Sequence, residues 1–108
     1  MVQASVNGTV LGAPDAGADM FFTYPQLIAH AARTRRLGAG TIIAAGAVSN
    51  RDPERGHGCI AEARMDEQER DGAPRTPWLH FGDLIRIEAF DADGRSLFGA
   101  IEQRIAQG

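Results

Sequence analysis

The clearest hydrophobic pattern in the chain lies near its C-terminal end, where apolar and polar residues alternate. Ile85, Ile87 and Ala89 fall on one face of an extended segment, and Arg86 and Glu88 fall on the other. A turn is predicted over residues 91–95. Residues 96–105 then return, and their alternate positions share one face: Leu97, Gly99, Ile101, Gln103 and Ile105. This pattern predicts two antiparallel strands joined by a hairpin.

A second hairpin and one helix are predicted in the N-terminal third. Residues 3–6 and 9–11 flank Asn7-Gly8, a pair in which both residues tolerate positive φ. The segment 24–33 begins after Thr23, a favourable N-cap, and its apolar residues have the spacing i, i+3, i+4 and i+7. They are Tyr24, Leu27, Ile28 and Ala31. We expect this helix to pack one face on a sheet.

The middle of the chain contains one apolar segment, which polar segments follow. Residues 41–48 are apolar and partly β-branched, which favours a buried strand. Residues 51–58 are polar, and residues 67–74 are charged and contain the turn signal Asp71-Gly72, so we expect loops there. The sequence therefore predicts a single domain over residues 1–108, mainly β with one helix (α+β).

Composition narrows the class of protein. Hydrophobic residues make up 44% of the chain and charged residues 23%, which is typical of a globular domain and too apolar for a disordered one. The net charge of −3 argues against a nucleic-acid partner, which calls for a basic patch. All 11 basic residues are arginine, so the chain offers no catalytic lysine. No signal peptide or membrane span is recognisable and Cys59 is the only cysteine, so we expect a cytoplasmic protein without a membrane partner.

Glu62 is the leading candidate for a catalytic residue. It follows the apolar or small residues 59–61, which would draw its carboxylate into a pocket wall, where it could orient a histidine or hold a water. From spacing alone, a structural salt bridge with Arg64 or a nearby arginine is the favoured interpretation. Ser49 and Asn50 offer polar side chains in a loop that follows Gly46. From the residues alone, the favoured interpretation is a turn in which both bond their own backbone.

The other polar clusters give weaker evidence for a functional site. His57 and Cys59, with or without Glu62, match no recognised zinc spacing or nucleophile pair. The run Asp91-Ala92-Asp93-Gly94 has its glycine too early for a calcium loop and is interpreted as a hairpin turn. His30 and His80 are interpreted as packed or surface residues. Trp78 and Phe81 are interpreted as core anchors.

The succession of motifs from Gly46 to Ile101 resembles the C-terminal end of the fumarylacetoacetate hydrolase family. The motifs run from Gly46 to Arg64, from Thr76 to Asp83 and from Ile85 through Phe90 to Ile101. The similarity extends from about Val2 to Ile105 and implies a partial antiparallel β-roll or barrel. It also assigns Glu62 to the glutamate that pairs with a water-activating histidine in relatives.

The same resemblance implies a substrate-binding loop at Ala47, Ser49 and Asn50. Relatives usually have Gly-Thr-Val-Ser-Asn here, and the threonine contacts substrate oxygens. Ala47 stands in its place, so one donor is missing at a cost of about 1 kcal/mol of binding. Ser49 and Asn50 remain as donors.

Family members hydrolyse a carbon–carbon bond in β-diketo (acylpyruvate-type) acids with a divalent metal such as Mg²⁺, Ca²⁺ or Mn²⁺. The resemblance implies that the metal carboxylates, the histidine and a lysine precede the matched region, so the chain itself contributes no metal ligand. It would then be the C-terminal portion of a hydrolase, inactive alone, that takes a small oxo-acid only when an N-terminal half completes it. We also expect a homo-oligomer. The alternative is a non-catalytic β-module that acts as a binding or assembly unit.

Overall fold

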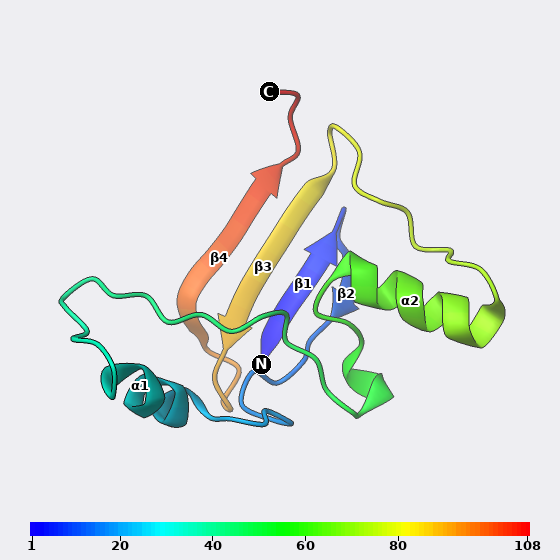
Figure 1. The fold of residues 1–108 in the computed structure, drawn as a ribbon. Helices are drawn as coiled ribbons and strands as arrows, with labels where there is room; N and C mark the ends of the chain where they lie inside the picture. The colour runs from blue at the N-terminus through cyan, green and yellow to red at the C-terminus, as the bar shows by residue number, and fades with distance from the viewer.

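The computed structural model describes residues 1–108 and contains one four-stranded antiparallel sheet and two α-helices (Figure 1). In chain order the elements are β1 (Val2–Val6), β2 (Thr9–Gly12), α1 (Tyr24–Ala32), a 3₁₀ turn (Pro53–Arg55), α2 (Ile60–Asp71), β3 (Leu84–Phe90) and β4 (Ser96–Arg104). The strand order is β2-β1-β3-β4. The sheet stays open with β2 and β4 as its edges, so the expected roll or barrel-like closure is not present.

The two predicted hairpins are confirmed. Asn7 and Gly8 both have positive φ, of 51° and 81°, and connect β1 to β2. The Asn7 side chain also joins this turn to the start of β3, because its Nδ2 donates to Asp83 (2.8 Å) and its Oδ1 accepts from the Leu84 N–H (2.9 Å). In the turn between β3 and β4, the Asp91 carboxylate accepts from the N–H groups of Asp93 and Arg95. Local turn chemistry therefore defines both connections.

Helix α1 forms where the sequence predicts it, but it does not pack on the sheet. Thr23 and Gln26 form a capping box at its start, with the Gln26 side chain accepting from the Thr23 N–H at 2.8 Å. None of its residues is buried. In Figure 1, α1 and α2 lie on opposite sides of the strands. The expectation of one helix covering the sheet is therefore wrong.

The second helix, α2, replaces a predicted loop. Its residues are mostly good helix formers, Gly72 ends it in the left-handed conformation (φ 79°), and Arg70 pairs with Asp66 one turn earlier. Only Ala63 is buried, so the helix lacks the apolar stripe by which helices are normally recognised. The expectation of a single helix was wrong because propensity and capping, rather than periodicity, form this one.

The apolar run 41–48 is not a strand. It has no regular structure, and the Ile42 side chain is 89% exposed. Neither sheet edge pairs with it, and β-branched residues become a strand only where a neighbouring strand accepts their hydrogen bonds. Trp78 and Phe81 are 57% and 69% exposed, so they are not core anchors.

The chain exposes far more surface than a compact monomer. Only four of its 108 residues are buried: Gly12, Pro14, Ala63 and Glu88. Its accessible area is 8238 Å². Folded monomers of 11.5 kDa expose about 5,800 Å², so the excess is about 2,400 Å². The radius of gyration, 16.3 Å, also exceeds the value of about 13 Å for a compact chain of this length.

Part of the exposed apolar surface lies on the sheet. Residues directly opposite in antiparallel strands share a face, and the register aligns Ala4 with Ile87 and Ile87 with Ile101. We call this the apolar sheet face; it comprises Val2, Ala4, Val6, Ile85, Ile87, Ala89 and Ile101. Ile101 is 59% exposed, and every residue of its strand, β4, is exposed.

No helix of the chain has the length and apolar character needed to cross a membrane.

Glu67 fastens the segment after α2 to the helix. Its carboxylate accepts from the Arg75 N–H (2.6 Å), the Thr76 N–H (2.8 Å) and the Thr76 hydroxyl (2.6 Å). These bonds, led by the one from the Thr76 hydroxyl, lower the pKa of Glu67 from 4.5 to about 2. Two residues on, Trp78 lies against the Arg64 guanidinium, 4.7 Å from the ring centre.

We expect this attachment to loosen in acid. Because the folded-state pKa of Glu67 is lowered, its stabilising contribution is complete above about pH 4.5 and is lost as the pH falls towards 2. Trp78 fluorescence should report a transition in this range, and Glu67→Gln should remove it. The matched control is Glu69→Gln, which alters an exposed side chain of the same helix and should leave the transition in place. An unchanged transition in Glu67→Gln would contradict this assignment.

Candidate functional site

The structure brings two of the predicted site residues into direct contact. Glu62 is the third residue of α2, and its Oε2 accepts from the Gly58 N–H at 3.0 Å. Its Oε1 accepts from the Ser49 hydroxyl, which comes from the loop over residues 46–50. A carboxylate held at both oxygens has a fixed orientation. We call residues 46–50 together with Glu62 the loop–helix site.

Close backbone approach keeps the loop and the helix together. A side chain at Gly58 would place its Cβ 2.1 Å from the Val48 carbonyl oxygen, well inside any real contact. Only glycine therefore allows the chain before α2 to lie against the loop. This contact brings Ser49 within hydrogen-bonding reach of Glu62.

Glu62 makes no ion pair with an arginine. Arg64 points elsewhere, donating to the Thr76 carbonyl and stacking on Trp78. The salt-bridge interpretation that spacing alone favoured is therefore wrong. The partners of Glu62 are neutral hydrogen-bond donors, which leaves it as the only charged group of the contact.

Asn50 braces the loop from its other side. Its Oδ1 accepts from the Asp15 N–H at 2.6 Å, and its Nδ2 donates to the carbonyls of Asp15 (3.1 Å), Ser49 (3.1 Å) and Ala18 (3.4 Å). The amide thus ties residues 15–18 to the loop–helix site. The sequence predicted that Asn50 bonds the nearby backbone in a turn. Of its four hydrogen bonds, only the one to the Ser49 carbonyl agrees with that prediction.

Asp19 adds a second tie that sequence reasoning missed. It takes positive φ (58°), and its Oδ2 accepts from the Arg51 N–H at 3.0 Å. Its Oδ1 also lies 4.0 Å from the Arg51 guanidinium. The only signal in the sequence was an acidic residue in a glycine-rich segment, because the partner is 32 residues away.

Ala47 and Ser49 line an open concavity of about 320 Å³. Most of the other lining residues are apolar, and they come from the loop and from the segment that leads into α1: Ala16, Ala18, Met20, Phe21, Phe22, Tyr24, Leu27, Ala45 and Val48. Asp19 is the only acidic residue in the lining. The volume suits a small molecule with an apolar part. Glu62 does not line the concavity itself and is connected to it through Ser49.

The residues do not form a metal site. No group of three or more His, Cys, Asp or Glu side chains is placed to hold an ion. His57 instead lies 3.8 Å from Asp66, whose carboxylate is bound by Arg70 at 3.0 Å. Hard divalent cations need several oxygen ligands at once, and Glu62 is already committed to Ser49 and Gly58. The chain's own donors therefore do not fit a divalent metal.

A family model described as fumarylacetoacetate (FAA) hydrolase C-terminal matches residues 1–106. The chain belongs to this family. The match covers nearly the whole chain and confirms the resemblance inferred from the motifs. No curated protein matches the chain.

Membership of the fumarylacetoacetate hydrolase family supports a hydrolase-like role. Family domains of this type are generally metal-dependent, in contrast to the donor set of this chain. The roles of Glu62 in catalysis and of Ala47, Ser49 and Asn50 in substrate binding stay predictions. The contacts described above place Ser49 with Glu62, put Ala47 in the wall of the concavity and give Asn50 a bracing position.

Proposed function

We propose that the chain supplies one wall of the active site of a fumarylacetoacetate hydrolase-like enzyme that cleaves a carbon–carbon bond in a β-diketo acid of the acylpyruvate type. The observation that carries this proposal is the Glu62 carboxylate, which is held by Gly58 and by Ser49, a residue that lines the concavity. Family membership supplies the reaction class. The small, largely apolar concavity agrees with an acid that carries an acyl chain.

Glu62 acts by orientation in this account. Its two oxygens are fixed by neutral donors, so the carboxylate can accept a further hydrogen bond from an imidazole in one defined direction. An imidazole held this way presents its other nitrogen to a water molecule and takes its proton as the water attacks a carbonyl carbon. His57 is turned towards Asp66, and His80 lies near Asp83. His30 lies on α1, outside the loop–helix site. We therefore expect the imidazole to come from another polypeptide segment.

The remaining groups must also come from outside this chain. Its residues supply neither a cluster of metal donors nor a lysine. The loop–helix site would then contribute the Ser49 hydroxyl, the oriented carboxylate and the apolar wall. The oxo-acid would bind only in the completed site.

Hydrolysis of acetylpyruvate, followed by loss of its enol absorbance, tests the proposal. We expect no turnover by the isolated chain with Mg²⁺, Mn²⁺ or Ca²⁺. Turnover should appear when the chain is co-expressed with a segment of a family member that carries the metal carboxylates, the histidine and the lysine. Metal-dependent turnover by the isolated chain that disappears in Glu62→Ala would refute this division of labour. A stable but inactive complex would favour the non-catalytic binding module.

A further inference from the structure

An uninterrupted basic region lies between Asp19 and Asp52. Residues 20–51 contain four arginines and one histidine but no acidic residue. Arg51 pairs with Asp19, whereas Arg33, Arg35 and Arg36 are exposed and have no acidic partner. Arg33 caps the C-terminal end of α1, where a cation favours the helix dipole. Arg35 and Arg36 lie beyond the helix, so helix capping does not account for them.

Most acidic side chains of this chain already have a partner within it. Of the 14 acidic side chains, 11 already accept a hydrogen bond or form an ion pair within the chain. The three that do not are Glu54, Glu69 and Asp93. They lie in three different elements: the 3₁₀ turn, α2 and the turn before β4. A second copy of the chain would therefore offer single carboxylates rather than a cluster.

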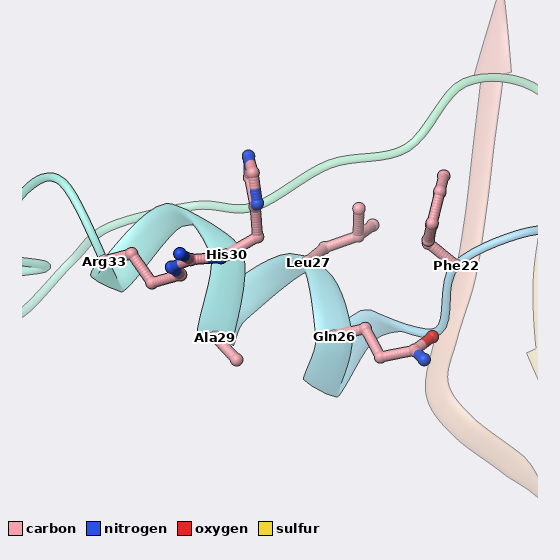
Figure 2. A pocket seen from close by; sticks show the side chains of 6 residues that line it. All are labelled: Phe22, Gln26, Leu27, Ala29, His30 and Arg33. Atoms are coloured by element: carbon pink, nitrogen blue, oxygen red, sulfur yellow. The ribbon is translucent and has the colours of Figure 1, made fainter.

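An apolar surface adjoins Arg33, and Arg35 and Arg36 follow within three residues along the chain. Phe22, Leu27 and His30 stand on one side of α1 and, with Arg33, line an open concavity of about 740 Å³ (Figure 2). Phe22 is 65% exposed, and no residue of α1 is buried. We call this surface together with Arg33, Arg35 and Arg36 the α1 docking surface. Its apolar centre and cationic end differ from an ordinary solvated helix, whose apolar stripe faces a core.

The chain also has the area that a lasting interface requires. A stable interface of standard size buries about 800 Å² on each partner. The excess exposure of about 2,400 Å², summed over the whole chain, is three times that, so the chain has enough uncovered surface for an interface of standard size.

We propose that the α1 docking surface binds an acidic amphipathic segment of another protein. The carboxylates of that segment would meet Arg33, Arg35 and Arg36, and its apolar side chains would cover Phe22 and Leu27. Planar guanidinium groups suit carboxylates, which they bind through paired N–H donors. The residues of the loop–helix site take no part, but Phe22 and Leu27 also line the concavity beside that site. The binding test itself does not depend on the proposed reaction.

The test uses a fluorescent synthetic peptide with glutamates on one helical face and leucines on the other, followed by anisotropy. We expect the full chain to bind it, less tightly as salt increases. The triple variant Arg33→Gln/Arg35→Gln/Arg36→Gln should bind at least tenfold more weakly, and Phe22→Ser should weaken binding as well. The matched control is Arg95→Gln, which removes the one other arginine whose side chain has no partner. It should leave binding unchanged, and circular dichroism should show the same fold in all variants.

Several results would overturn the proposal. Absence of binding by the wild-type chain would do so, as would equal binding by the triple variant or by Phe22→Ser. Equal binding of a peptide with glutamine in place of glutamate would remove the charge argument. Tighter binding of a DNA duplex of the same net charge would assign the arginines to nucleic acid instead.

Discussion

Sedimentation of the isolated chain should show assemblies larger than its 11.5 kDa monomer at micromolar concentration. The chain exposes about 2,400 Å² more than a compact monomer of its mass, and the apolar sheet face accounts for part of that excess. Covering a few hundred Å² of apolar surface at about 25 cal/mol/Å² contributes several kcal/mol before the entropy of association is subtracted. The unpaired edge of β4 offers further hydrogen bonds to a neighbouring strand. We therefore propose that the free chain self-associates, as the expected homo-oligomer requires.

A charge on the apolar sheet face should weaken this association. Ile101→Lys places an ammonium group on the exposed edge strand and should shift sedimentation towards the monomer. The matched control is Ile101→Val, which keeps the site apolar and should retain the assembly. A well-folded wild-type monomer at high concentration would contradict the proposed self-association.

Local signals made the hairpins and α1 predictable. Asn7-Gly8, the alternation from Leu84 to Phe90 and the Thr23 capping position each act within a few residues. Helix α2 escaped prediction because it has little apolar periodicity. Residues 41–48 have the composition of a strand but pair with no neighbouring strand. Whether a neighbour is available depends on the tertiary structure, which composition does not reveal.

The site was predictable only in part for the same reason. Spacing alone favoured a salt bridge for Glu62, and family resemblance assigned it a catalytic role, which stays a prediction. Neither indicated that Ser49, 13 residues earlier, would donate to it. The Asn50 brace spans 35 residues and depends on how the loop folds over residues 15–18. Such contacts follow from the fold as a whole.

The central claim is that Glu62 is the working carboxylate of a site that another polypeptide completes. The most direct measurement is kcat for acetylpyruvate hydrolysis by the chain co-expressed with its complementary family segment. Glu62→Gln keeps the side-chain shape but removes the charge that orients the imidazole, so kcat should fall by about 10²- to 10⁴-fold.

Glu69→Gln is the matched control, because it removes a carboxylate from the same helix that contacts nothing in the loop–helix site. Its kcat should equal that of wild type, and both variants should form the complex. We therefore expect kcat to fall in Glu62→Gln and to stay at the wild-type value in Glu69→Gln. A Glu62→Gln complex that turns over at the wild-type rate would contradict it.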